Sequence, residues 1–253
     1  GILDALAAGK HVLCEKPLAP SAADCLPMIE AEVAIGRPMI WAGFMRRFDP
    51  AYTAMKEALD AGQIGQPIMM HNIHRNVEAP DWFSGQLAIT NSASHEFDIV
   101  RFVLGSELAS ITAFEGHTGA AIPPIMMVLE TAAKQIVTVE MNNNATYGYD
   151  VRGEVVGTEG TVELGANIAA KVNLGLAATA PYVPDWRPRF AEAYRLQNRA
   201  WVQSILSGVP DSRAATAWDG YCAAMVGEAG VAALTQGARN TISLLDRPAL
   251  YDR

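Results

Sequence analysis

The hydrophobic pattern at the start of the chain alternates between helix and strand. It predicts a helix, a strand, a second helix and a second strand at residues 1–8, 11–14, 24–35 and 38–44. For the second helix, Ser21 and Asp24 are both possible N-caps. We prefer Asp24 because Pro27 then lies in the first turn, where its missing N–H is harmless. Strand, helix and strand in this order form one parallel crossover unit, as at the end of a doubly wound sheet.

From residue 46 onwards, strands follow one another with short turns. The pattern predicts helices at residues 50–61, 91–104, 190–208 and 219–236, and strands at 68–76, 109–115, 125–130, 135–142, 151–164 and 241–244. The turn 157–160 breaks the strand at 151–164. We place the N-cap of the last helix at Asp219, and we expect residues 177–188, with their three prolines, to be the least regular segment. Successive strands with short turns indicate a mainly antiparallel sheet, and the fold class is α/β (α+β).

Composition narrows the class of protein. The 253 residues are 50% hydrophobic, which excludes disorder and suffices for one large or two modest domains. The net charge of −8 and the lack of any run of five or six like charges argue against nucleic-acid and anionic-membrane partners. No apolar stretch approaches the roughly 20 residues that span a bilayer. We therefore expect a cytoplasmic protein. Its three cysteines and five histidines match no metal-ligand spacing, so we expect no metal site.

Two segments could carry chemistry. Lys16, in Glu15-Lys16-Pro17, follows the first strand at its carboxyl end, where open α/β sheets hold their ligands, although a plain surface lysine explains it equally well. On the helix predicted at 91–104, Asn91, His95 and Asp98 have the spacing i, i+4 and i+7. Asp98 could orient His95 as a general base. Alternatively, Asp98 pairs with Arg101 and His95 is a buried histidine of the core.

The strand at 68–76 carries polar side chains on both faces. Alternation points Asn72, His74 and Asn76 to one face and His71, Ile73 and Arg75 to the other. The first set suits a polyhydroxyl ligand or a solvated edge. The pair Arg46-Arg47 and the tripeptide Tyr147-Gly148-Tyr149 allow the same two interpretations.

Considered together, these motifs are more specific. They are Gly-Lys-His-Val-Leu-Cys-Glu-Lys-Pro-Leu at 9–18, the segments 43–52 and 74–76, Asn-Ser-Ala-Ser-His-Glu-Phe-Asp at 91–98, and the turn 157–160. In order and spacing they resemble the glucose-fructose oxidoreductase / inositol dehydrogenase family (Gfo/Idh/MocA), and within it the inositol 2-dehydrogenase type. The resemblance covers nearly the whole chain.

The resemblance implies two domains. Residues 1–44 would be the C-terminal remnant of a Rossmann dinucleotide-binding domain, and residues 45–253 a substrate and oligomerisation domain with a large, mainly antiparallel open sheet. The implied activity is NAD- or NADP-dependent oxidation of a secondary alcohol on a cyclitol or sugar such as myo-inositol. The implied assembly is a homodimer or homotetramer formed through the open sheet.

The resemblance also implies roles for single residues. His95 would be the general base, Lys16 would take part in the proton relay, and Glu15, Lys16 and Pro17 would contact the cofactor. The substrate-binding positions implied are Met45, Arg46, His74, Asn76, Asn91 and one of Tyr147 and Tyr149. Many inositol dehydrogenases have an aspartate where this chain has Asn91, which cannot accept a proton. The relay carboxylate must then come from Asp98, or the relay has two members.

The family's glycine-rich loop would lie in strands preceding Gly1. We therefore expect the 253 residues alone to bind NAD(H) poorly and to show no measurable oxidation of myo-inositol. We expect a version carrying those strands to be active. The alternative function is a non-catalytic, truncated sugar-binding or assembly module.

Overall fold

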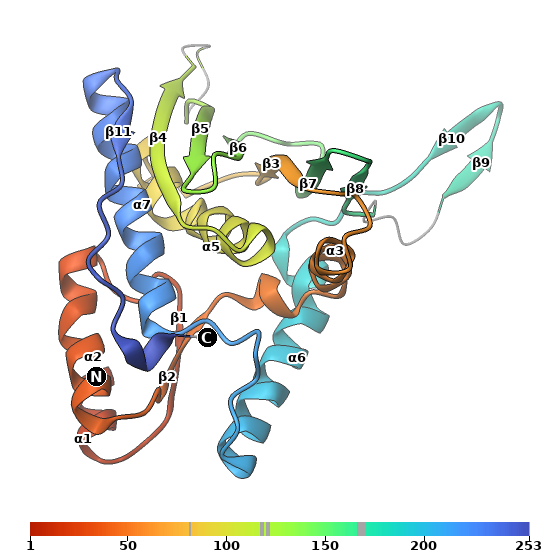
Figure 1. Cartoon of the computed structure of the whole chain (residues 1–253). Coiled ribbons are helices and arrows are strands. Elements are labelled where there is room, and N and C mark those ends of the chain that lie inside the picture. Colours follow the sequence, from red (N-terminus) through yellow and green to blue (C-terminus); the bar gives the residue numbers. More distant parts are fainter. Residues whose placement is uncertain (81, 117–118, 120–121, 166–170, 253) are drawn as a thin grey trace.

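The first residues form the predicted crossover. They contain α1 (Ile2–Ala7), β1 (Val12–Glu15), α2 (Ala22–Ile35) and β2 (Ile40–Gly43). β1 and β2 pair in parallel, with Val12 opposite Ile40, which confirms the predicted topology (Figure 1). The computed structural model describes residues 1–80, 82–116, 119, 122–165 and 171–252.

The start of α2 differs from the prediction. Ser21 has an extended backbone, and its hydroxyl accepts a hydrogen bond from the N–H of Asp24. The preference for Asp24 as N-cap was therefore wrong, and Pro27 lies inside the helix. A hydroxyl that accepts one of the free N–H groups of the first turn stabilises the earlier start, and this outweighed the cost of the proline.

A seven-stranded sheet forms the larger part of the molecule. Its strands are β3 (Pro67–Arg75), β4 (Leu108–Glu115), β5 (Ile125–Thr131), β6 (Ile136–Asn142), β7 (Asp150–Gly157), β8 (Thr161–Glu163) and β11 (Asn240–Thr241). The order is β11-β4-β5-β6-β3-β7-β8, and only β3 and β6 pair in parallel. The large, mainly antiparallel sheet is confirmed.

The four predicted long helices are present, but three start elsewhere. The helical segments are η1 (Met45–Phe48), α3 (Pro50–Asp60), α4 (Gly85–Leu87), the π-helical η2 (Ala88–Ser92), α5 (Ser94–Leu104), α6 (Trp186–Ser207), α7 (Ala217–Gln236) and η3 (Ala249–Tyr251). Thr216 caps α7, and Asp219 completes its capping box from inside the helix. Asn91 lies in η2 and not in the predicted α-helix, and Asp185 caps α6.

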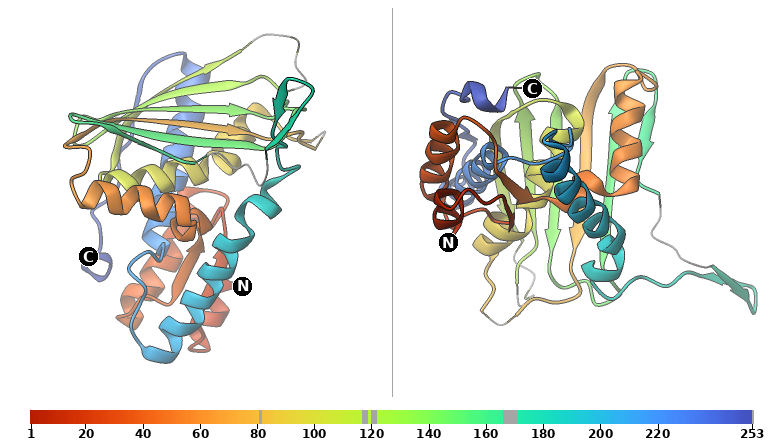
Figure 2. Two further views of the ribbon diagram at one scale, coloured as in Figure 1. Left: turned by 90° about the vertical axis from the view of Figure 1, so that its right-hand side faces the viewer. Right: turned by 90° about the horizontal axis from the view of Figure 1, so that it is seen from below.

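The segment predicted to be irregular contains regular structure. β9 (Val172–Leu174) and β10 (Ala177–Thr179) form an antiparallel hairpin, and α6 begins before Pro188. The hairpin projects from the body of the molecule (Figure 2, right). The prolines misled the prediction because proline is tolerated in the first turn of a helix.

The two faces of the sheet differ. Helices lie along one face, where Met70, Asn72 and His74 of β3 are buried (Figure 2, left). Phe114, Met126 and Val128 of β4 and β5 are exposed on the opposite, open face. Alternation along β3 is therefore as predicted, and the helix-covered face holds the candidate site. Among the described residues, no helix has the length and apolarity needed to cross a membrane.

Candidate active site

Lys16 and Asn91 meet where β1 approaches the helical layer. The Nζ of Lys16 donates to the side-chain Oδ1 of Asn91 at 2.9 Å and to its main-chain oxygen at 3.2 Å. Burial lowers the pKa of Lys16 to about 8, and the positive charge of Arg46 acts in the same direction. Lys16 is therefore a cation that can lose its proton near neutral pH.

His95 lies on α5, one turn after Asn91. It is buried, and its ring packs edge-on against Phe44. Burial, followed by the charges of Lys16 and Arg46, holds its pKa well below the usual range. Its Nδ1 has no hydrogen-bond partner among the described residues. His95 is thus a neutral imidazole that is able to accept a proton.

A buried charge cluster lies beside this pair. Arg46 of η1 pairs with Glu96 of α5, and both oxygens of Glu96 lie within 3.2 Å of His74 Nδ1 on β3. The Arg46 guanidinium also stacks 5.3 Å from the ring of Phe190. Burial alone would raise the pKa of Glu96, but Arg46 and His74 lower it to about 2.

Sequence reasoning assigned no role to Glu96. All but one of the residues of α5 are buried, so the helix shows no polar face from which an inward carboxylate could be recognised. The only signal is a glutamate between His95 and Phe97 on a helix that carries few other charges.

The two tyrosines have different environments. The hydroxyl of Tyr149 lies 3.5 Å from His74 Nε2, and its ring packs edge-on against the imidazole. The hydroxyl of Tyr147 bonds Arg75 and Asp150, so this residue is directed away from the cluster. Of the two alternatives, Tyr149 is therefore the substrate-site candidate.

Two further predicted substrate-binding residues are Met45 and Asn76. Met45 is buried in η1 beside Arg46. Asn76 follows β3, and its amide Nδ2 donates to Asn143 Oδ1 at 2.9 Å. Their predicted contacts with substrate stay predictions.

Asp98 does not orient His95. Its two oxygens accept hydrogen bonds from Arg47, at 2.9 Å from Nε and 2.5 Å from Nη2. The alternative partner, Arg101, instead binds Glu107 and Asp219. The predicted contact was wrong because Asp98 points from α5 towards η1, and it joins these elements through a buried ion pair. Of the two relays considered, the one with Asp98 is excluded, and the relay of His95 and Lys16 alone stays a prediction.

The residues at the end of β1 fit one end of a dinucleotide. Glu15 is exposed, Pro17 is half-buried, and Lys16 reaches from there to Asn91. They would hold the nicotinamide ribose, since parallel strands bind nucleotides at their carboxyl ends. The 253 residues contain no Gly-x-Gly-x-x-Gly loop that could hold a pyrophosphate.

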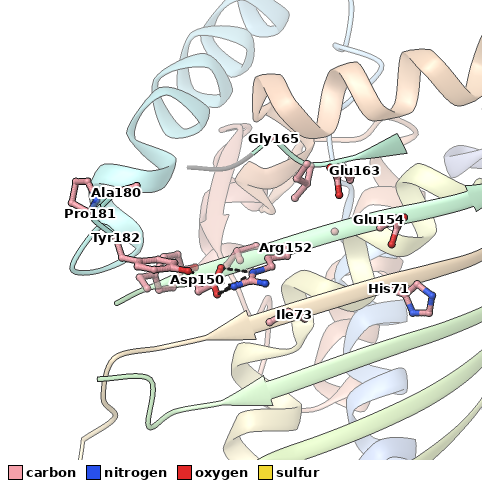
Figure 3. A pocket seen from close by; sticks show the side chains of 14 residues that line it. His71, Ile73, Asp150, Arg152, Glu154, Glu163, Gly165, Ala180, Pro181 and Tyr182 are labelled. Atoms are coloured by element: carbon pink, nitrogen blue, oxygen red, sulfur yellow. Dashed lines mark hydrogen bonds and ion pairs between the residues drawn. The ribbon is translucent and has the colours of Figure 1, made fainter. Parts of the chain in front are cut away.

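A pocket of about 500 Å³ lies elsewhere. Its lining includes His71, Ile73, Glu154 and Glu163, which belong to β3, β7 and β8, together with Tyr182 (Figure 3). Of the candidate site residues, only Tyr149 lines it. Lys16 and His95, the two candidates for proton transfer, do not line this pocket.

Comparison with known proteins now identifies the family. Residues 2–43 match the oxidoreductase family with an NAD-binding Rossmann fold, and residues 52–163 match the GFO/IDH/MocA C-terminal domain. Inositol 2-dehydrogenase 1 of Saccharopolyspora erythraea is 47% identical over 96% of this chain and 73% of its own length. The chain belongs to the GFO/IDH/MocA oxidoreductase family.

Other relatives agree. Inositol 2-dehydrogenase of Streptomyces avermitilis is 40% identical over 99% of this chain and 74% of its own length. The myo-inositol dehydrogenase from Lactobacillus casei, solved in complex with NAD(H) and myo-inositol, superimposes with a TM-score of 0.93 at 27% identity. That alignment covers 99% of this chain and 76% of the L. casei chain. The fold is that of a GFO/IDH/MocA oxidoreductase.

Proposed function

We propose that this GFO/IDH/MocA chain acts as an NAD-dependent dehydrogenase of the inositol 2-dehydrogenase type, oxidising a secondary alcohol of a cyclitol. The observation that carries the proposal is that Lys16 and His95, predicted from separate motifs, lie in one site beside Arg46, where Lys16 bonds Asn91 one turn before the buried His95. The relatives named above, which are inositol dehydrogenases, suggest the substrate class, and myo-inositol is the first substrate to test.

His95 would accept the hydroxyl proton. Its lowered pKa leaves the ring neutral and free to take that proton as the carbonyl forms. The Lys16 ammonium would stabilise the developing negative charge on the oxygen. NAD, when bound, supplies the acceptor for the hydride that leaves the carbon. We propose NAD over NADP because the L. casei structures contain NAD(H).

The remaining hydroxyls of the substrate would face the charge cluster. Arg46 Nε is buried without a partner among the described residues, so it has a free donor. His74 and Tyr149 add an imidazole and a phenol at its side. Several donors and acceptors on rigid elements suit a ring that carries many hydroxyls.

We further propose that the protein is cytoplasmic and that copies associate through the open face of the sheet. Phe114, Met126 and Val128 lie together there, since Phe114 is opposite Met126 in the register of β4 and β5. An apolar strip on a sheet face without covering helices favours contact with a second copy.

The test is NAD-dependent oxidation of myo-inositol by a version that carries the family's glycine-loop strands ahead of Gly1. We expect turnover that His95→Ala and Lys16→Ala each lower by about 100-fold or more. Turnover that survives His95→Ala with an unchanged pH profile would exclude His95 as the base. Calorimetry of this longer version with NADH and with myo-inositol distinguishes an assembly module, which would bind only the sugar or neither.

A further inference from the structure

Glu96 lies between Arg46, which can only donate hydrogen bonds, and His74, which can donate or accept them. The guanidinium of Arg46 carries donors and no acceptor. The imidazole of His74 has one protonated and one bare nitrogen when it is neutral. All three side chains are buried, so no solvent shields their mutual charges.

The distances favour one position for the proton on His74. Its Nδ1 lies 3.1 and 3.2 Å from the two oxygens of Glu96, and 3.3 Å from Nη2 of Arg46. A bare Nδ1 would direct its lone pair at a carboxylate that is itself only an acceptor. A proton on Nδ1 instead gives a charge-assisted hydrogen bond to Glu96, and Arg46 still donates to the same carboxylate.

We propose that Glu96 is a positioning residue that fixes the ring proton of His74 on Nδ1 and so presents Nε2 as a hydrogen-bond acceptor for a substrate hydroxyl. Tyr149 supports this, because its hydroxyl lies 3.5 Å from Nε2 and can donate to it until a substrate arrives. The role in substrate recognition rests on the proposed function, whereas the position of the proton does not.

The substitution Glu96→Gln should reverse this arrangement. Because Arg46 only donates, the amide oxygen of glutamine would face Arg46 and its NH₂ group would face His74. Nδ1 would then accept, and the proton would move to Nε2. Glu96→Asp keeps the carboxylate and should keep the proton on Nδ1.

The experiment is ¹⁵N NMR of the histidine-labelled chain at pH 8, with the His74 signals assigned by their loss in His74→Gln. We expect the Nδ1–H tautomer in the wild type and in Glu96→Asp, and the Nε2–H tautomer in Glu96→Gln. The matched control is Glu140→Gln, which removes one carboxylate partner of Arg75. Arg75 is next to His74 in the sequence but lies on the open face, so this variant should leave the tautomer unchanged.

A wild-type proton on Nε2, or on both ring nitrogens, would overturn the proposal even if Glu96→Gln did not fold. An unchanged tautomer in a folded Glu96→Gln would overturn it as well. In an active version, we expect Glu96→Gln to raise KM for the polyol about tenfold, with a smaller effect on kcat, because one acceptor is lost. The predicted tautomer without any cyclitol oxidation would contradict the proposed function alone.

Discussion

Lys16 donates to both oxygens of Asn91, 75 positions away in the sequence, with 2.9 Å between Nζ and the side-chain Oδ1. An ammonium group only donates, so Oδ1 of Asn91 must face Lys16 and its NH₂ group must face away. Asn91 therefore fixes Lys16 in place without adding a charge. This leaves burial as the main influence on the pKa of Lys16.

Replacing Asn91 by aspartate should move the alkaline limit of activity upwards. If Lys16 acts as a cation, the rate falls as the pH rises through its pKa of about 8. A carboxylate at the position of Asn91 favours the ammonium form and raises that pKa by about one unit or more. The measurement is the pH profile of kcat. Asn240→Asp, at the half-buried Asn240 of the edge strand β11, is the control, and an unmoved alkaline limb in Asn91→Asp would contradict the role of Lys16.

Replacing His95 should lower kcat far more than it changes KM. The neutral ring provides the proton acceptor, and general-base catalysis contributes about 10²- to 10⁴-fold. We expect this loss in His95→Ala and in His95→Gln, measured as steady-state NADH formation. The control is His71→Ala, since His71 bonds Thr138 on the open face of the sheet. If His71→Ala lost as much activity as His95→Ala, the loss would point to a folding defect and not to catalysis.

The sequence predicted the contents of the site better than its geometry. Spacing of i, i+4 and i+7 placed Asn91, His95 and Asp98 on one face of a continuous helix. In the structure, the N–H of Ala93 bonds the oxygen of Ala88, five residues earlier, so the chain makes a π-helical turn before α5 begins. Asn91 still reaches Lys16, whereas Asp98 turns to Arg47. Local spacing cannot reveal which charge of η1 a buried carboxylate will meet.

Glu96 marks another limit of sequence reasoning. A glutamate inside an apolar helix is unfavourable until Arg46, 50 positions away, and His74 are brought beside it. Only the tertiary contact of η1, β3 and α5 supplies these partners. By contrast, the alternation that buried Asn72 and His74 and left the side chains on the other face of β3 half-buried was predictable, because a strand has a fixed period of two.

Removing the carboxylate of Asp98 should cost stability. Asp98→Ala leaves the buried Arg47 with Asp219, 3.0 Å from its Nη2, as its remaining ionic partner, and losing one partner of a buried ion pair costs up to about 3–5 kcal/mol. The measurement is the free energy of unfolding in urea. The exposed pair of Glu192 and Arg195 provides the control, since Glu192→Ala should change it by less than about 1 kcal/mol. A similar small effect of Asp98→Ala would show that the pair does not hold η1 to α5.

Glu96 should make the free energy of unfolding depend on pH in the acid range. Its folded pKa of about 2 lies below the ordinary value of 4.5, so its contribution is fully present above about pH 4.5 and is lost as the pH falls towards 2. The difference corresponds to roughly 3 kcal/mol. Glu96→Gln should thus be less stable than the wild type at pH 7 and closer to it at pH 3. Urea unfolding at both pH values measures this, and an equal difference at both would contradict it.

A charge on the open face should weaken association between copies. Phe114 is 57% exposed on β4 and faces Met126 of β5, so Phe114→Glu puts a carboxylate into the apolar strip proposed as the contact. Burying an unpaired carboxylate is unfavourable, and in sedimentation experiments we expect the variant to run as a smaller species than the wild type. Leu206→Glu is the matched control, because Leu206 is 81% exposed on α6, outside the sheet. If Leu206→Glu dissociates the assembly and Phe114→Glu does not, the contact involves α6 and not the open sheet.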